Sequence, residues 1–320
     1  MKVLIYCFYV SIFIFSISYY SLGQHKVDNA WEIWEKEYKS YVTREQLIYT
    51  RKEISLSFWR NGSVYETIAS YYQSLTDSEE LIDELKIDPS IRYKIVKAPF
   101  DDSEHKKMTS ELDAMKNPED RFFLKMPQNE QNEYLKLWKK RFSYYKLASA
   151  RDENKYLTDA QKKTGQEIQI MFMRHYPLFI TPRMFNALDL NAEQKLKLNQ
   201  ICQKLEPEYK EYIDKLVESE FSWQFKLANK ISETKIQSNE EFFNLHKKHK
   251  KEYFASDEWQ ELLRQKNLFI AKLEKEVSQI LTDKQLQRMN ELINNPFDSV
   301  KKCIKVLNNE FNVKSNRSNH

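Results

Sequence analysis

Glycine is scarce in this chain: only 3 of the 320 residues are glycine. A β-rich or α/β protein of this length normally needs more glycine for its tight turns, and a phosphate-binding loop needs several glycines close together. Proline is limited as well, with 8 residues. The scarcity of both residues predicts an all-α fold of long helices with few connections. It also excludes a glycine-rich nucleotide loop.

The chain lacks a strong net charge and a recognisable catalytic motif. Its formal net charge is +4, which is too small for the clustered basic face typical of nucleic-acid binding. No Gly-x-Ser-x-Gly or His-Glu-x-x-His motif occurs. We therefore expect a protein that is not an enzyme, that holds no cofactor and that has no nucleic-acid partner.

Cysteine is rare, and its placement bears on the compartment. Cys7 lies inside an apolar N-terminal run, which leaves Cys202 and Cys303. In an oxidising compartment an even pair suggests one disulfide; the alternative is two separate buried thiols. A short final helix that folds back over the open end of a helical hairpin would bring the two together. The bond would close a loop of roughly 100 residues.

An apolar run stands at the start of the chain. Lys2 is followed by uncharged residues from Val3 to Leu22, and small residues stand three before and one before a cut after Gly23. This pattern predicts a secretory signal peptide over residues 1–23. The alternative is an uncleaved membrane anchor, since about 20 residues suffice for a span. In both cases we expect export to a periplasmic or extracellular location, with membrane contact only if the segment is retained.

Apolar residues recur at three- and four-residue steps along most of the remaining chain, which predicts helices. Residues 24–78 are predicted to form an N-terminal helical segment. Asn61-Gly62 within it either separates two helices or turns a β-hairpin. Further along, Pro99 opens a looser charged region between residues 97 and 129.

Two helical repeats are predicted beyond the N-terminal segment, over residues 79–177 and 178–308, and a disordered tail over 309–320. The second repeat has two apolar stripes, which predict an antiparallel helical hairpin. Pro207 in its first arm is expected to kink the helix or force a local adjustment. The stripes are Leu198, Ile201, Leu205, Tyr209, Tyr212 and Leu216, and then Trp259, Leu262, Leu263, Phe269, Ile270, Leu273, Val277 and Ile280.

One short motif occurs three times, each time at an expected helix start. It consists of Leu, then Thr or Asn, two spacers, then Gln. In such a capping box the Thr or Asn side chain accepts a bond from a first-turn N–H, and the Gln side chain reaches back to the N–H of the cap residue. The copies are Leu157, Thr158 and Gln161; Leu190, Asn191 and Gln194; and Leu281, Thr282 and Gln285.

The motif copies suggest a degenerate internal duplication. At an offset of 103 residues, Leu85 aligns with Leu188 and Asp88 with Asn191, and Asp88 can cap a helix as Asn191 does. The closing copies at Leu157 and Leu281 are 124 residues apart. Each half then consists of an opening cap, a long helical stretch and a closing cap, with an insertion in the second half. The alternative is a chance similarity between helix starts.

The repeated Leu-[Thr/Asn]-x-x-Gln motif, in a chain expected to be exported and helical, resembles the LTxxQ family of Spy- and CpxP-like periplasmic stress proteins. The resemblance covers about half of the chain, in patches, and the first 150 residues match little of it. It implies long antiparallel helices that often dimerise into a curved cradle. It also implies an ATP-independent chaperone or a partner of an envelope-stress sensor, and zinc binding in some relatives.

The only candidate metal ligands are His246 and His249, three residues apart and therefore on one helix face. Lysines at 247, 248, 250 and 251 oppose a cation there, and a solvated basic face is the alternative. A site would also need three or four ligands.

Two function classes remain. One is a chaperone-like binding protein that holds a partner or unfolded protein. The other is a structural or interaction component of the envelope without a small-molecule ligand. Exposed Trp and Phe on one concave face would favour the first, and burial of these residues the second. The sequence leaves a homodimer open.

Overall fold

The computed structural model describes residues 44–62, 64, 79–115, 127–175, 180–234 and 239–311. Within these ranges the regular elements are helices, and no strand occurs. The predicted all-α fold is therefore confirmed. The predicted signal peptide lies outside the described residues, as does the predicted tail from residue 312 on, whereas residues 309–311 of that tail belong to the last helix. Within the described ranges, none of the helices combines the length and apolarity that a membrane span requires.

Helix α3 (Arg44–Asn61) ends where glycine permits an unusual backbone conformation. Gly62 has φ +60°, and its N–H donates to the carbonyl oxygen of Phe58 at 3.1 Å. Residues with a Cβ rarely adopt this left-handed conformation, so glycine is favoured at a helix C-terminus. Because α3 includes the whole stretch 54–58, the hairpin alternative at Asn61-Gly62 is wrong.

The first repeat is more helical than predicted. Its elements are α5 (Glu79–Asp83), α6 (Pro89–Asp101), α7 (Ser103–Ala114), α8 (Gln128–Tyr156) and α9 (Asp159–Phe172). The looser region expected from residue 97 is wrong as far as residue 114. Pro99 lies inside α6, near its C-terminal end, and its missing N–H leaves one backbone hydrogen bond of the helix unmade. The side chain of Asp102 then starts α7 by accepting from the N–H groups of Glu104 and His105 at 3.0 and 3.2 Å.

The second repeat contains the predicted hairpin. Its elements are the 3-10 helix η4 (Pro182–Leu188), α10 (Ala192–Thr234), α11 (Asn239–Phe254), α12 (Asp257–Ser278), α13 (Asp283–Asn294) and α14 (Asp298–Phe311). α10 continues through Pro207 as one helix and packs against α12. The return arm is divided at Ser256, whose hydroxyl caps α12 by accepting from the N–H of Trp259 at 3.2 Å.

Ion pairs fix the antiparallel register of α10 and α12. The Lys204 ammonium lies 2.7 Å from a carboxylate oxygen of Glu276, and one turn further Lys272 pairs with Glu208. The residue numbers of both pairs add to 480, as antiparallel packing requires. The first predicted stripe, from Leu198 to Leu216, is buried along its whole length, and most of the second stripe is buried too.

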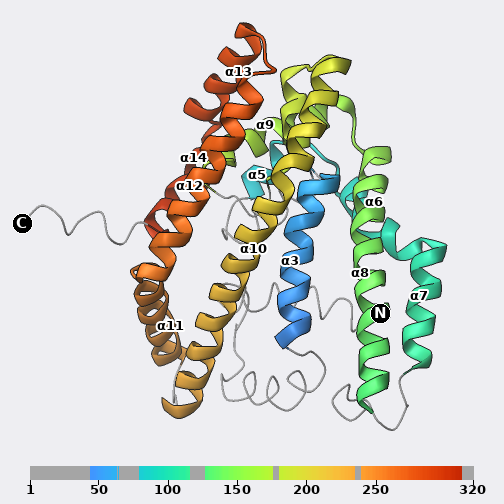
Figure 1. The fold of residues 1–320 in the computed structure, drawn as a ribbon, viewed down its shortest axis with the longest axis vertical. Coiled ribbons are helices and arrows are strands. Elements are labelled where there is room, and N and C mark those ends of the chain that lie inside the picture. The colour runs from blue at the N-terminus through green and yellow to red at the C-terminus, as the bar shows by residue number, and fades with distance from the viewer. Residues whose placement is uncertain are drawn as a thin grey trace, which may run out of the picture.

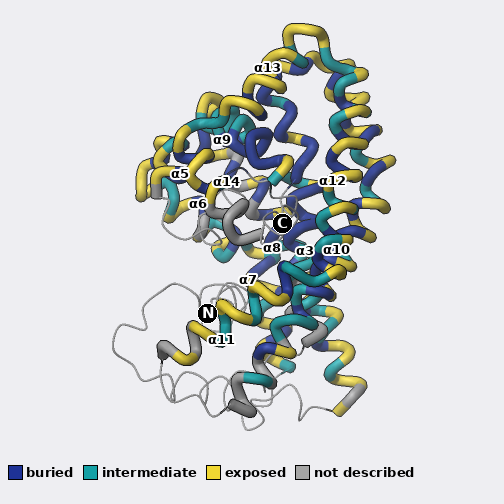
Figure 2. Tube along the Cα trace, turned by 90° about the vertical axis from the view of Figure 1, so that its left-hand side faces the viewer, coloured by how far each residue is buried: buried dark blue, intermediate teal, exposed yellow. Residues whose placement is uncertain are grey.

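α3 joins the two repeats through its aromatic side chains. Trp59 stacks on Tyr209 of α10 at 4.5 Å between ring centroids and lies 5.7 Å from the ring of Phe269 on α12. On its other side α3 packs against α8, where the ring of Tyr49 meets that of Trp138 edge-on at 5.9 Å. Figure 1 shows α3 between α10 and α8. In Figure 2 the buried residues line the inward sides of these helices.

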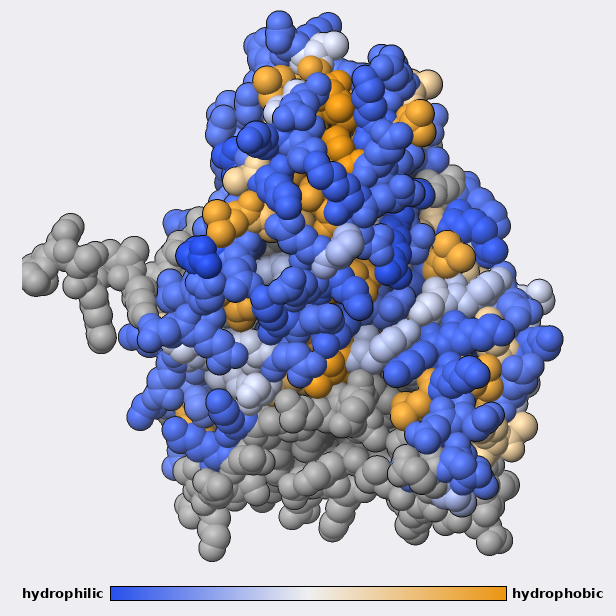
Figure 3. Space-filling model, viewed as in Figure 1, coloured by the Kyte–Doolittle hydropathy of each residue, from blue (hydrophilic) through white to orange (hydrophobic). Residues whose placement is uncertain are grey.

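The face of the molecule that is seen in Figure 1 is mainly hydrophilic where its residues are described (Figure 3). Figure 3 shows apolar atoms in a narrow strip at the upper end of the molecule, where α12 and α10 adjoin, and otherwise in small separate spots. Hydrophilic residues cover most of the rest of the described surface on this face, as expected for helices whose apolar faces are turned inward.

Candidate functional site: two glutamine clasps at capped helix starts

The three motif copies form the predicted capping boxes. At Thr158 and at Thr282 the backbone N–H donates to the Gln Oε1 three residues on, at 2.9 Å in both cases. The Thr hydroxyl in turn accepts from the Gln N–H at 3.2 and 3.4 Å. Asn191 and Gln194 make the same reciprocal pair, with both distances 2.9 Å. The prediction from the Leu-[Thr/Asn]-x-x-Gln pattern is therefore confirmed at all three places.

The two closing glutamines also reach a different part of the chain. Gln161 Nε2 donates to the carbonyl oxygen of Lys86 at 3.0 Å. Gln285 Nε2 donates to the carbonyl oxygens of Leu188 and Asp189 at 3.0 and 3.4 Å. We call each of these contacts a glutamine clasp. In the first repeat the clasp ties the start of α9 to the turn that precedes α6, and in the second it ties the start of α13 to the turn that precedes α10.

The turns held by the clasps share a rare backbone conformation. Lys86 and Asp189 have φ values of 49° and 55°, and they are the non-glycine residues with positive φ in the part of the chain that the structure describes. Their separation is 189 − 86 = 103 residues, which equals the offset between the two opening caps. A bulky residue seldom adopts this conformation, so finding it at aligned positions supports the predicted duplication. The closing glutamines, Gln161 and Gln285, are 285 − 161 = 124 residues apart, which is the offset between the two closing motif copies.

The second repeat adds one contact to its clasp. Gln194 Nε2 donates to the carbonyl oxygen of Ile280 at 2.8 Å and to Oε1 of Gln285 at 2.7 Å. The residue that aligns with Gln194 in the first repeat is Ile91, since 194 − 103 = 91, and its side chain cannot make these bonds. The start of α10 is thus fixed to the end of α12 by amide groups that the first repeat lacks.

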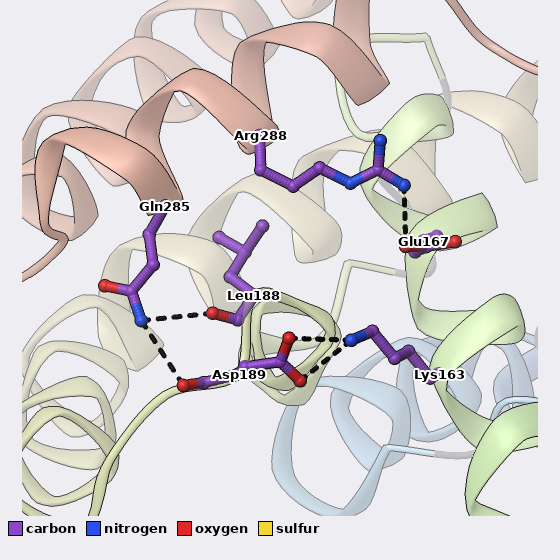
Figure 4. Close-up of polar contacts among 6 residues, drawn as sticks. All are labelled: Lys163, Glu167, Leu188, Asp189, Gln285 and Arg288. Carbon is purple, nitrogen blue, oxygen red and sulfur yellow. Dashed lines mark hydrogen bonds and ion pairs between the residues drawn. The ribbon is translucent and has the colours of Figure 1, made fainter.

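Two ion pairs surround the second clasp and involve α9 of the first repeat. Lys163 Nζ lies 2.7 and 2.8 Å from the carboxylate oxygens of Asp189, and Arg288 donates to Glu167 at 2.9 Å. Figure 4 shows Lys163 and Glu167 reaching the turn and α13 from the same helix. The hydrogen bond with Glu167 raises the pKa of Arg288. The arrangement joins the two repeats, because α9 packs directly on η4 and α13.

A substitution at Thr282 tests the capping chemistry. We expect Thr282→Ala to lower the free energy of unfolding by about 1 kcal/mol, because the first-turn N–H loses its acceptor. Thr282→Asn is expected to be nearly neutral, since Asn191 already fills the equivalent place. Urea denaturation of the three proteins measures both effects, and equal stabilities for the Ala and Asn variants would contradict the capping account.

The candidate metal ligands His246 and His249 lie on α11 beside α10. The ring of His246 meets that of Trp223 edge-on at 6.0 Å, and His249 Nδ1 lies 3.3 Å from Oε2 of Glu252. Burial, with a smaller effect of Lys250, lowers the pKa of His246 to about 4. Within the described ranges, no group of three or more His, Cys, Asp or Glu side chains is arranged to hold a metal ion. The pair therefore has no third protein ligand among the described residues.

Cys202 and Cys303 are not bonded to each other, so the predicted disulfide is not formed in the structure. The reason lies in the last helix. α14 packs mainly on α9 and α5 of the first repeat, and Ser299 Oγ donates to Glu84 at 2.9 Å. The prediction placed this helix over the open end of the α10–α12 hairpin. Cys303 is buried, and burial raises the pKa of Cys202 to about 12.

Sequence reasoning found the caps and missed the clasps. The Gln side chain has one oxygen and one NH₂ group, and a capping box uses only the oxygen. The free NH₂ group was the available signal that each closing glutamine has a further partner. For Lys86 the residue type did not indicate a positive φ, because lysine is not favoured in the left-handed region.

Searches against protein-family models, curated proteins and solved structures find no match for this chain.

Proposed function

We propose that this chain is an exported, non-enzymatic helical protein that acts as a structural or interaction component and binds a protein partner through its polar surface. The observation that carries the proposal is the placement of the aromatic side chains. Every Trp and Phe whose side chain the structure describes is buried or half-buried. A chaperone that holds unfolded protein needs a contiguous exposed apolar surface.

Apart from the narrow strip where α12 and α10 adjoin, the large exposed apolar side chains of the described residues are too scattered to form such a surface. Among the described residues the large ones are Tyr93, Leu147, Leu196 and Leu268, which are 65%, 53%, 60% and 57% exposed. They belong to four different helices: α6, α8, α10 and α12. Single exposed apolar residues are normal on soluble proteins and indicate no binding site.

The clasps and the ion pairs support a framework role. The two clasps and the Arg288–Glu167 ion pair join segments that lie 75 to 121 residues apart in sequence. Such contacts hold a fixed shape, and the amide groups at their centre do not titrate near neutral pH. The resemblance to the LTxxQ family supports the helical design. It supports a chaperone activity less, because the motif residues are used here for capping and clasping.

An aggregation-suppression assay with the purified mature chain tests the proposal. We expect no suppression of the aggregation of a heat-denatured client protein at equimolar ratio, and no rise in the fluorescence of a dye that binds apolar surfaces. Partial unfolding of the same chain in mild urea is the matched control, since it exposes the buried aromatic residues. Suppression by the native chain would reject the framework proposal in favour of a chaperone.

A further inference from the structure

Among the described residues, four lysines where α10 and α11 pack together have no ionic partner. Lys226 of α10 and Lys247, Lys248 and Lys251 of α11 are exposed, and none of them makes an ion pair within the described part of the chain. Lys251 stands four residues after Lys247 and three after Lys248, so these three lie on one side of α11. We call the four residues the α11 basic surface. In contrast, Lys204 and Lys272 at the hairpin seam are both paired.

The pKa values of the neighbouring His246 and His249 respond to the positive charge of this surface. Burial lowers the pKa of His249 first, and Lys230 and Lys226 lower it further, against the opposing effect of Glu252. Burial and then Lys250 lower the pKa of His246. Both imidazoles are therefore biased toward the neutral form, so the positive charge of this corner comes from lysine. An anion bound beside the lysines would stabilise the protonated imidazole and raise these pKa values.

Packed aromatic side chains between α10 and α11 hold the α11 basic surface in place. The ring of Trp223 on α10 stacks on that of Tyr253 on α11 at 5.2 Å, and Trp223 Nε1 donates to the carbonyl oxygen of His249 at 3.1 Å. The hydroxyls of Ser219 and Tyr253 share a buried hydrogen bond of 2.9 Å. These contacts fix α11 on α10, so the helix backbone that carries the lysines is ordered before a partner binds. A fixed backbone lowers the entropy cost of binding.

We propose that the α11 basic surface binds an acidic segment of a protein partner, whose carboxylates pair with Lys226, Lys247, Lys248 and Lys251. Charge complementarity of this kind steers association and selects the partner. The proposal rests on the proposed function in one respect, namely that the partner is a protein. Figure 1 shows α11 beside the lower part of α10, at the opposite end of the hairpin from α13, so a partner there would leave the clasps untouched.

A membrane surface is the less favoured anionic partner. A helix that binds in the plane of a bilayer inserts large apolar side chains between the lipids, in addition to its lysines. The exposed large apolar residues among the described side chains lie on α6, α8, the first turns of α10 and α12. None of them is on α11, so the described part of this surface has positive charge but no large exposed apolar side chain that could insert between lipids.

The test is binding of a short fluorescent glutamate-rich peptide to the full mature chain, followed by fluorescence polarisation at low and physiological salt. The triple variant Lys247→Glu, Lys248→Glu and Lys251→Glu is compared with a control that has Lys195→Glu, Lys210→Glu and Lys284→Glu. The control lysines are also exposed and unpaired among the described residues, and both variants change the net charge equally. We expect the first variant to lose at least about tenfold in affinity and the control to stay within about twofold. Circular dichroism confirms that both are folded.

Two further measurements make the result decisive. On saturation with the peptide, the imidazole of His249 should titrate at a higher pH in NMR spectra, and an unchanged titration would overturn the proposal. Equal losses in both triple variants would overturn it as well, since they would indicate a non-specific effect of net charge. Binding to phosphatidylglycerol vesicles without binding to the peptide would assign the surface to a membrane instead. The aggregation assay above reports on the proposed function independently of these results.

Discussion

Replacing Gly165 by alanine is expected to lower the free energy of unfolding by about 2 kcal/mol or more, although alanine is the better helix former by about 1 kcal/mol. Gly165 is buried in α9, and a Cβ built there lies 1.7 Å from Cγ1 of Val64 and 3.3 Å from Cδ2 of Leu85. Val64 cannot withdraw easily, because its N–H donates to Oε1 of the buried Glu153 at 2.7 Å. Chemical denaturation of the variant measures the loss.

The companion substitution Val64→Ala separates the clash from other effects. It removes Cγ1, after which the nearest atom of residue 64 to the new methyl group is Cβ, at 3.1 Å. We therefore expect the double variant to be more stable than the sum of the two single effects predicts, by about 1–2 kcal/mol. Strictly additive losses would show that the contact between α9 and Val64 is not the cause.

Replacing Lys266 by methionine is expected to stabilise the protein, by an amount on the order of 3 kcal/mol near neutral pH. Lys266 stands within the apolar stripe of α12, between Leu262 and Phe269, and no hydrogen bond or ion pair of its ammonium is found among the described residues. Burial lowers its pKa from 10.5 to about 8. In the first repeat the aligned position is Phe142, since 266 − 124 = 142, and this side chain is buried.

The pH dependence gives a sharper form of the same prediction. Below about pH 8 both the folded and the unfolded chain carry the proton of Lys266, so the full cost of burying the charge is present. Between about pH 8 and 10.5 only the unfolded chain keeps that proton, and the wild type gains stability as the pH rises. The advantage of Lys266→Met should therefore shrink across this window.

Lys275→Met is the matched control for this prediction. Lys275 is exposed on the same helix, and its substitution should change the stability by no more than about 0.5 kcal/mol at any pH. Urea denaturation at several pH values compares the three proteins. A gain from Lys266→Met that is the same at pH 7 and above pH 10 would contradict the buried-charge explanation.

Features that depend on local spacing could be predicted from the sequence. The three- and four-residue steps from Leu198 to Leu216 predicted the buried face of α10. The Leu-[Thr/Asn]-x-x-Gln pattern predicted three helix starts. Both signals act within one or two turns, where side-chain geometry follows directly from the residue order. The weak alignment of Leu85 with Leu188 also indicated the correct pairing of the two turns.

Features that depend on contacts between distant segments could not be predicted in this way. The need for glycine at position 165 comes from Val64, about a hundred residues earlier, and no local pattern reveals it. The predicted disulfide required the direction of α14, which is set by its packing on α9 and α5. The sequence did not indicate the role of Lys266, because a lysine inside an apolar stripe looks like an interruption, whereas the structure holds it half-buried within the stripe, where desolvation lowers its pKa.

The clasps have a consequence for how the length of the chain can vary. The clasp of the first repeat joins residues 75 apart, and that of the second joins residues 97 apart. Because the entropy of closing a flexible loop grows only with the logarithm of its length, the longer loop costs about 0.2 kcal/mol more than the shorter one. A hairpin can therefore gain several turns at its far end almost without penalty, while its two clasped ends stay fixed. We therefore expect insertions during evolution to accumulate at that free end of the hairpin, which is where α11 carries its lysines.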